Sequence, residues 1–285
     1  MPELPEVEVL VRHLRPQLQG QTIRAVLVRR ERVIAGTSIR QFTQALQGAK
    51  FTALSRRGKY LLFSLLPAKK SKPRILYGHL GMTGRMYLRT ARTALPKHAA
   101  VVLDLGRKNF VFEDTRYFGR LTLDPGGIEN LGPEPLDSAL VPENFAQALK
   151  CSTQPIKVKL LDQSLVAGVG NIYASEALFR AGISPRIAAR RLRPAQVTRL
   201  WQAIRGVLTE AIELGSTVPL DYDGKDARDG FFYFGRGPGT PAFYEERLRV
   251  YDRAGRPCIN CARPIKRLVQ ASRSTFYCSQ SQRDQ

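Results

Sequence analysis

The first residues of the chain could carry amine chemistry. Pro2 follows the initiator Met and would be exposed by ordinary methionine removal. A free amino-terminal proline is a secondary amine, which can attack an aldehyde-like carbon and form a charged iminium that serves as an electron sink. An α-amino group titrates near about 8, so much of it is unprotonated at neutral pH. Glu3 lies beside it as a candidate proton donor, although proline is also a common second residue.

A second candidate site lies near the carboxyl end. Cys258, Cys261 and Cys278 are followed by Ser281, with spacings of two, sixteen and two residues. The first pair has the spacing of zinc ligands, and structural zinc usually takes four protein ligands. In a chain without a secretion signal, clustered cysteines favour metal over disulfides. Three interpretations stay open: a zinc site that has lost a ligand, a hairpin that needs no metal, and no site.

A third stretch could bind an anion. In "AGVGNIYASEALF", Gly168 and Gly170 precede Asn171, which we predict to be the N-cap of a helix. Exposed amides at a helix start bind anions readily, because the helix dipole adds to their hydrogen bonds. A Gly-Val-Gly before a helix is weak evidence when taken alone.

The composition points to a polyanionic partner. The 285 residues include 45 basic and 24 acidic ones, which gives a formal charge of +21. Nucleic acid is the first expectation and a membrane surface the second, with a merely soluble basic protein as the alternative. The stretch from 179 to 205 carries seven arginines and no acid, which favours a phosphate-binding face. Without a signal peptide or an apolar span, we expect a cytoplasmic protein with no membrane partner.

The elements that must position these residues indicate an α+β multidomain protein. Short apolar runs within 1–130 predict an N-terminal β-sandwich domain. A helix should precede it, because Val7, Leu10, Val11 and Leu14 recur at helical spacing. Residues 131–150 are rich in Pro and Gly and predict a linker. We expect a helical domain over 151–244, with a loop at about 215–244, and a Cys-bearing β-hairpin over 245–285.

The order of several motifs identifies a family. The sequence closely resembles the formamidopyrimidine-DNA glycosylases of the endonuclease VIII superfamily, nearly from end to end. Relatives that prefer oxidised pyrimidines typically open differently, so the start of this chain favours the purine-repair branch. The resemblance rests on "PELPEVE", "RRGKYLL", "HLGMTG", "EDTRYFGR", "LGPEPL", "GVGNIYASEALF" and the final hairpin.

The resemblance implies a separate catalytic role for each of several residues. In the family the mature amino-terminal proline attacks C1′ of the damaged nucleotide, a role that falls on Pro2. Proton transfer during ring opening falls on Glu3, and Glu6 matches a family glutamate near the same site. Lys59 would contact phosphate and assist β-elimination, although a lysine at a strand edge is ordinarily surface decoration. Arg273, in the terminal hairpin, would assist δ-elimination.

The resemblance also implies how the gap left by an extruded base is filled. The family uses a methionine, an arginine and a phenylalanine, which match Met82, Arg116 and Phe118. Core packing is the alternative for Met82 and Phe118, yet both lie in Gly-bounded turns. His98 matches a family DNA contact, whereas His79 is more consistent with a structural role.

The helix start and the hairpin complete the implied DNA contacts. The family's helix-two-turn-helix element holds backbone phosphate through an asparagine that matches Asn171, with Lys157 as a neighbouring contact. The family's zinc is held by four cysteines, and a neutral serine is a poor substitute for the fourth, which water or Asp284 could complete. Some relatives keep the hairpin without metal, so bound zinc stays open here. The loop at 215–244 closes over the flipped base in the family but looks longer here, and no lesion contact is assigned to it.

The resulting functional hypothesis is a bifunctional DNA glycosylase and abasic-site lyase of base excision repair. It would excise 8-oxoguanine and formamidopyrimidines from double-stranded DNA as a monomer, without an organic cofactor. One alternative is an endonuclease VIII-like preference for oxidised pyrimidines. Another is a non-catalytic protein that binds damaged DNA, against which Pro2, Glu3 and Lys59 argue.

Overall fold

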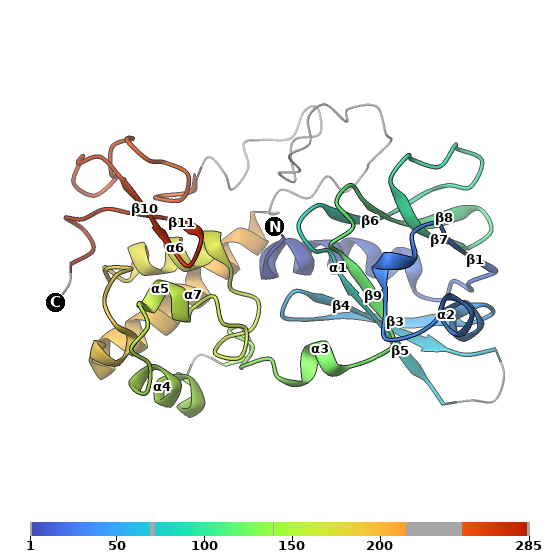
Figure 1. Ribbon diagram of the computed structural model, residues 1–285, viewed down its shortest axis with the longest axis horizontal. Coiled ribbons are helices and arrows are strands. Elements are labelled where there is room, and N and C mark those ends of the chain that lie inside the picture. The colour runs from blue at the N-terminus through green and yellow to red at the C-terminus, as the bar shows by residue number, and fades with distance from the viewer. Residues whose placement is uncertain (1, 69–71, 139, 215–246, 284–285) are drawn as a thin grey trace. The chain divides into compact units, whose positions relative to one another are not determined.

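The computed structural model describes all residues except 1, 69–71, 139, 215–246 and 284–285. The chain divides into two compact units (Figure 1). Unit 1 contains Pro2 and residues 6–129 of the described chain, and unit 2 contains residues 3–5, 130–214 and 247–283. Within the described residues, no helix combines the length and apolar character of a membrane span.

Unit 1 is built on two antiparallel-rich sheets. One sheet has the strand order β1-β7-β8-β6 and the other β2-β9-β5-β4-β3. The predicted N-terminal β-sandwich with flanking helices is thus confirmed. The strands are β1 (Ala25–Val28), β2 (Ile34–Ala35), β3 (Lys50–Arg57), β4 (Tyr60–Leu66), β5 (Arg74–His79), β6 (Gly84–Thr90), β7 (Ala99–Asp104), β8 (Lys108–Asp114) and β9 (Arg120–Thr122). The helical segments are α1 (Leu4–Leu18), η1 (Glu31–Val33), α2 (Ile39–Leu46) and α3 (Gly126–Glu129).

Helix α1 covers the core of unit 1 with the face that the sequence predicts. Val7, Val11 and Leu14 are fully buried, and Leu10 is 4% exposed. They pack in one cluster with Phe63 and with other residues of both sheets and α2. Burying an aliphatic side chain of this size contributes roughly 1.5–3 kcal/mol, so this face holds α1 on the core of unit 1.

Unit 2 is helical and ends in a hairpin. Helices α6 and α7 pack on each other, and strands β10 and β11 pair antiparallel from Lys266↔Tyr277 to Gln270↔Arg273. Its segments are α4 (Glu143–Lys150), α5 (Ile156–Lys159), α6 (Asn171–Arg180), η2 (Ala189–Arg191), α7 (Pro194–Glu213), β10 (Lys266–Gln270) and β11 (Arg273–Tyr277). The stretch predicted as a linker, 131–150, thus includes α4, and the domain boundaries stay a prediction.

A buried carboxylate joins the hairpin region to α6. Both oxygens of Glu176 accept backbone hydrogen bonds, from Arg249 N at 2.9 Å, Val250 N at 2.9 Å and Tyr251 N at 2.8 Å. Burial raises the pKa of Glu176, and these backbone bonds partly offset the effect. Three satisfied N–H groups fix the segment that leads into the hairpin.

Candidate nucleic-acid interface and metal centre

The carboxylate of Glu3 lies at the amino-terminal end of α6. It accepts hydrogen bonds from Gly170 N at 2.7 Å, Ile172 N at 2.9 Å and Tyr173 N at 3.3 Å. Glu3 is 2% exposed, so these bonds are shielded from water and take the place of a side-chain cap from the helix itself. The prediction that Asn171 is the N-cap is wrong, because α6 begins at Asn171 and its N-cap is Gly170.

The two glycines of the turn make room for the start of the chain. A Cβ on Gly170 would lie 2.4 Å from Glu3 Cδ, and one on Gly168 would lie 2.6 Å from Leu4 Cβ. Gly168 also has φ +86, a conformation that glycine adopts without strain. The Gly-Val-Gly pattern therefore lets residues 3 and 4 approach the turn, where Leu4 N donates to Gly168 O at 3.1 Å.

Lys157 and Asn171 form a hydrogen-bonded pair beside this carboxylate. Lys157 Nζ donates to Asn171 Oδ1 at 2.6 Å, and Asn171 Nδ2 donates to Ser274 O of β11 at 3.0 Å. Lys157 is 1% exposed. Burial lowers its pKa to about 8, Glu3 opposes that shift and Arg273 adds to it. The structure thus brings together four residues that the sequence analysis names, Glu3, Lys157, Asn171 and Arg273.

Arg273 is presented by a tight turn. It is exposed and follows Ala271 and Ser272, whose φ values are +46 and +58. Two consecutive positive φ values are the signature of a two-residue type I′ hairpin loop. The bond from Asn171 to Ser274 O ties strand β11 to α6. Arg273 therefore projects from a short loop whose adjoining strand is anchored to a helix.

Two neighbouring turns of unit 1 expose an apolar pair. Met82 is 37% exposed and Phe118 is 41% exposed, which is inconsistent with core packing. The guanidinium of Arg116 lies 4.9 Å from the ring centroid of Phe118, within cation–π range. Exposed apolar side chains beside a cation suit insertion into stacked bases.

A buried aspartate that the sequence analysis missed holds both turns. Asp114 is fully buried and accepts from Thr83 Oγ1 at 2.5 Å, Arg116 N at 3.1 Å and Gly119 N at 2.7 Å. Thr83 belongs to the turn of Met82, and Arg116 and Gly119 belong to the turn of Phe118. The signal was present in "EDTRYFGR", where an Asp precedes a turn whose amides it can accept.

The turns also approach each other closely through glycine. Gly81 has φ +62, and a Cβ there would lie 2.6 Å from Gly119 N and from Phe118 C. A side chain at residue 81 would therefore force the backbone of Phe118 and Gly119 to move. The Gly-bounded turns therefore fix where Met82 and Phe118 project.

Lys59 lies in the tight connection between β3 and β4. Lys59 is 7% exposed, so it is not an ordinary solvent-exposed surface lysine. The turn is braced by Arg56, whose Nη1 donates to Gly58 O at 3.0 Å and whose Nε lies 3.0 Å from Glu8 Oε2. Pro2 is also buried, and so is Glu6, at 6% exposure.

The two histidines of unit 1 differ in their surroundings. His79 accepts from Gly81 N at its Nδ1, 3.0 Å away. Burial lowers its pKa to about 4, with Lys59 and Arg120 adding to the effect. A neutral, hydrogen-bonded ring fits the structural role expected for His79. His98 is half-buried, with its Nδ1 3.4 Å from the hydroxyl of Tyr117.

The cysteine cluster offers three thiols and one hydroxyl. The Sγ atoms of Cys258, Cys261 and Cys278 all lie within 4.8 Å of one another, and Ser281 Oγ lies 3.5 Å from Cys258 Sγ and 3.6 Å from Cys261 Sγ. Burial raises the pKa of Cys278, but hydrogen bonds from Ser281 and from the backbone outweigh it and lower the pKa to about 7. Three converging thiols fit a metal ion such as zinc, with a weak fourth donor. Asp284 and the 215–244 loop lie outside the described residues.

Comparisons with known proteins identify the family that the chain resembles over nearly its whole length. A family model described as the formamidopyrimidine-DNA glycosylase N-terminal domain matches residues 1–121, and one described as the H2TH domain of the same enzyme matches residues 131–220. A formamidopyrimidine-DNA glycosylase from Symbiobacterium thermophilum is 41% identical over 291 residues, which cover 99% of this chain and 89% of that protein.

Solved structures extend the likeness to three dimensions. A complex of Lactococcus lactis Fpg with DNA containing N7-benzyl-Fapy-dG aligns with a TM-score of 0.83 at 30% identity, over 99% of each chain. A complex of the same protein with DNA containing an abasic site aligns with a TM-score of 0.84 at 30% identity, again over 99% of each chain.

Proposed function

Since the chain belongs to the formamidopyrimidine-DNA glycosylase family, we propose that it is a bifunctional DNA glycosylase and abasic-site lyase. It excises oxidised purines, 8-oxoguanine and formamidopyrimidines, from double-stranded DNA. The observation that carries the proposal is the network at the start of α6. There a buried carboxylate next to Pro2 in sequence lies beside a buried lysine with a pKa of about 8.

The proposed reaction begins at the amino terminus. After removal of Met1, the Pro2 nitrogen attacks C1′, the bond from C1′ to the damaged base breaks, and the base leaves with a proton. Opening of the sugar ring transfers a proton to O4′ and leaves an iminium between Pro2 and C1′. Glu3 is the group for that proton transfer, because it is the adjacent residue and its carboxylate is fixed by three backbone amides.

Strand cleavage then follows from the iminium. It acidifies the proton at C2′, whose loss expels the 3′ phosphate in β-elimination. Lys59 assists this step, since a buried lysine in a braced turn can neutralise a phosphate at a fixed place. A second elimination expels the 5′ phosphate, with Arg273 of the hairpin turn as the cation that supports it. Water finally releases Pro2.

The remaining residues hold the DNA. Lys157 and Asn171 bind backbone phosphate at the start of α6, and His98 and Glu6 support the contacts in unit 1. Met82, Arg116 and Phe118 fill the gap left by the extruded nucleotide. Two exposed apolar groups beside a cation support that assignment.

The cysteine cluster has a structural part in this proposal. Cys258, Cys261 and Cys278 would hold a zinc ion with Ser281 Oγ as a poor fourth donor, and zinc would supply only a crosslink within the hairpin region. Glu176 already fixes the segment before the cluster. We therefore propose that binding of zinc is weak and that the chemistry at Pro2 does not depend on it.

Borohydride trapping tests the reaction, because it reduces the iminium to a stable covalent bond with DNA. We expect an adduct with an 8-oxoguanine duplex and a sharp loss of that adduct in Pro2→Gly. Absence of any adduct from the wild type, together with tight and salt-sensitive binding to abasic DNA, would instead identify a non-catalytic damage binder.

Substrate preference needs a separate comparison. Matched duplexes containing 8-oxoguanine or thymine glycol should be cleaved at different rates, with the purine lesion faster. Faster cleavage at thymine glycol would favour the endonuclease VIII-like alternative.

A further inference from the structure

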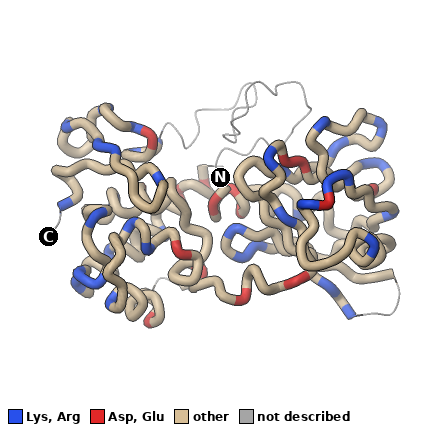
Figure 2. Tube along the Cα trace, viewed as in Figure 1, with Lys and Arg blue, Asp and Glu red and all other residues tan. Residues whose placement is uncertain are grey.

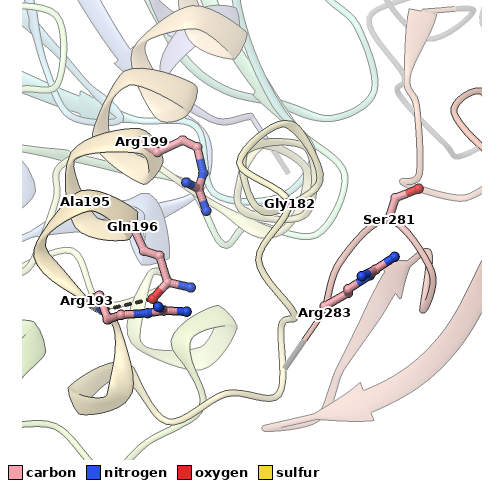
Figure 3. Close-up of a pocket in the computed structure, with 7 residues that line it drawn as sticks. All are labelled: Gly182, Arg193, Ala195, Gln196, Arg199, Ser281 and Arg283. Carbon is pink, nitrogen blue, oxygen red and sulfur yellow. Dashed lines mark hydrogen bonds between the residues drawn. The ribbon is translucent and has the colours of Figure 1, made fainter. Parts of the chain in front are cut away.

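The exposed arginines of unit 2 suit binding of the DNA backbone. Figure 2 shows Lys and Arg recurring along both units. At the start of α7, Arg193 and Arg199 line a cavity that Arg283 approaches from the carboxyl-terminal segment (Figure 3). All three are exposed, and guanidinium groups match phosphate oxygens in geometry and charge. Backbone binding accounts for this cavity without a further function.

Arg56 of β3 differs from these arginines because its hydrogen bonds are directed at groups of the protein. Its Nε donates to Glu8 Oε2 at 3.0 Å, and its Nη1 donates to Gly58 O at 3.0 Å. The side chain of Arg56 is 8% exposed and that of Glu8 is 18% exposed, so both bonds are largely shielded from water. One guanidinium thus connects helix α1 with the loop between β3 and β4.

That loop consists of two residues, Gly58 and Lys59. Arg57 pairs with Tyr60 across it. Gly58 has φ +55, as expected for glycine at the first position of a type II′ hairpin loop. The carbonyl that Arg56 binds belongs to the peptide group that joins Gly58 to Lys59, and a peptide group is planar and rigid. Arg56 therefore holds the peptide on which the backbone position of Lys59 depends.

The carboxylate of Glu8 is bound on both of its oxygens. Oε2 accepts from Arg56, and Oε1 accepts from Arg12 Nε at 2.8 Å. Burial raises the pKa of Glu8, but the hydrogen bonds from Arg12 and Arg56 outweigh that effect and hold the pKa below its ordinary value. Glu8 is therefore ionised at neutral pH, and its charge orients the guanidinium of Arg56.

A second contact aligns α1 with the same strand. Arg15 Nε donates to Leu54 O of β3 at 2.8 Å, and Arg15 lies about two helical turns beyond Glu8. Helix α1 begins two residues after Pro2. The helix that follows Pro2 and the strand that leads to Lys59 are thus tied at two points, and the bond between Glu8 and Arg56 is the one beside the loop.

We propose that Glu8 is a positioning residue for strand cleavage, because through Arg56 it holds the loop that presents Lys59. The inference rests on the proposed role of Lys59 in β-elimination. In that step the proton at C2′ is lost and the 3′ phosphate leaves, so the ammonium must lie where the negative charge develops. A displacement of about 1 Å can cost about 10² in rate. A shifted loop would slow this step and leave the attack by Pro2 unchanged.

The experiment separates iminium formation from strand cleavage on a duplex that contains an abasic site. Borohydride present from the start measures iminium formation, and single-turnover nicking without borohydride measures cleavage. Glu8→Gln removes the charge that orients Arg56, so nicking should slow by up to about 10²-fold while trapping keeps the wild-type rate. Arg12→Gln is the matched control, because it removes the other ion pair of Glu8, whose arginine side chain is 60% exposed. It should change neither rate.

A double variant tests whether Glu8 acts through Lys59. Lys59→Met should slow nicking, and Glu8→Gln/Lys59→Met should be no slower than Lys59→Met, because no lysine is left to position. Residues that act through one another are not additive in this way, whereas independent ones are. Two effects that multiply, or a Glu8→Gln variant that slows trapping and nicking equally, would overturn the proposal.

Arg56→Lys carries the test if circular dichroism shows that Glu8→Gln does not fold. Lysine keeps a positive charge beside Glu8 but lacks the planar fork that also reaches Gly58 O, so nicking should again slow more than trapping. Nicking at the wild-type rate in Arg56→Lys would overturn the role of Glu8 and leave the proposed function intact. A wild type that forms no adduct would overturn the proposed function itself.

Discussion

Asp114 in unit 1 and Glu3 in unit 2 are both buried carboxylates that accept three hydrogen bonds. Asp114 joins two turns that project an exposed methionine, arginine and phenylalanine. Glu3 joins the start of the chain to the start of α6, and in the proposed reaction it also moves a proton. Under the proposed reaction, Asp114 only positions other groups, whereas Glu3 both positions a helix start and takes part in the chemistry.

In both regions one carboxylate holds the backbone at the end of a regular element, Asp114 at the end of β8 and Glu3 at the start of α6. A carboxylate offers several acceptor sites, so one side chain can satisfy the amides of an entire turn. Where that carboxylate has no chemical role, its replacement should change binding and stability. Where it has one, replacement should change the rate of a chemical step as well.

The largest expected effect is that of Glu3→Gln. An amide keeps one acceptor for the backbone of α6 but cannot transfer a proton, and loss of a positioned acid or base typically costs about 10²–10⁴ in rate. We expect single-turnover excision of 8-oxoguanine to fall by that factor.

The control for Glu3→Gln is a duplex that already contains an abasic site. It presents an aldehyde to Pro2 and needs no base to leave, so borohydride trapping should persist. An equal loss on both substrates would show that Glu3 acts only by holding α6, as Asp114 holds its turns.

A smaller effect is expected from Asp114→Asn. One Asn oxygen cannot accept from all of Thr83, Arg116 and Gly119, and each buried donor left without a partner costs about 1–3 kcal/mol. We expect a lower free energy of unfolding and weaker binding to a lesion duplex. The chemical rate at saturating protein should be nearly unchanged.

Thr83→Val is the matched control, because it removes one donor and leaves both amide bonds of Asp114 intact. Its cost should be about 0.5–1.5 kcal/mol. An Asp114→Asn variant with wild-type affinity would show that the exposed Met82 and Phe118 need no fixed turns.

Lys157 should make DNA affinity depend on pH. Its pKa of about 8 means that the ammonium is lost as the pH rises through 8, and a neutral amine does not attract phosphate. We expect affinity for duplex DNA to fall above pH 8 by up to about tenfold, the equivalent of about 1.4 kcal/mol. Lys157→Met should remove that part of the pH dependence, as measured by fluorescence anisotropy.

Stability should change in the opposite direction over the same range. Between about 8 and the ordinary value of 10.5, the unfolded chain binds more protons at Lys157 than the folded one. The contribution of this group to folding stability therefore rises with pH in that window. The difference in free energy of unfolding between the wild type and Lys157→Met, measured by denaturant unfolding, should rise with pH in this window. A difference that does not change with pH would show that burial does not lower the pKa of Lys157.

The sequence predicts much of the fold, because local patterns carry it. The helical spacing of Val7, Leu10, Val11 and Leu14 led to α1, and the short apolar runs led to the two sheets. The assignment of Asn171 as the N-cap of α6 failed, since the group that caps the helix is Glu3, 167 residues away from Gly170. No periodicity or spacing encodes a contact of that length.

For the candidate site, the sequence likewise predicts which residues take part but not how they are placed in the fold. Lys157, Asn171 and Arg273 could be named from motifs, whereas their mutual placement depends on the bond from Asn171 to Ser274. The run of seven arginines could not be sorted from sequence, because Arg180 and Arg205 find partners only in the folded unit. Asp114 was visible as an Asp before a turn, but its bond to Thr83 spans 31 residues.

The smallest effect on activity is expected from substitutions in the cysteine cluster. Like Asp114 and Glu3, the buried thiols of Cys258 and Cys278 accept backbone hydrogen bonds. Asn260 N donates to Cys258 Sγ and Ser281 N donates to Cys278 Sγ, each at 3.4 Å, so the thiols are positioned by backbone amides as the two carboxylates are. Ser281→Cys supplies the fourth thiolate. Zinc affinity should rise by more than roughly a hundredfold, beyond the 10–100-fold typical of a residue that only supports a ligand.

Glycosylase activity should change little in Ser281→Cys, because Glu176 and the bond from Asn171 to Ser274 already hold the hairpin region. Cys151→Ser is the matched control: Cys151 is exposed and lies outside the cluster, so neither zinc content nor activity should respond. Competition with a chromophoric chelator measures the affinity. A wild type that already retains one zinc against that chelator would show that a serine hydroxyl suffices, and a large gain in activity would show that amide positioning alone does not hold Arg273.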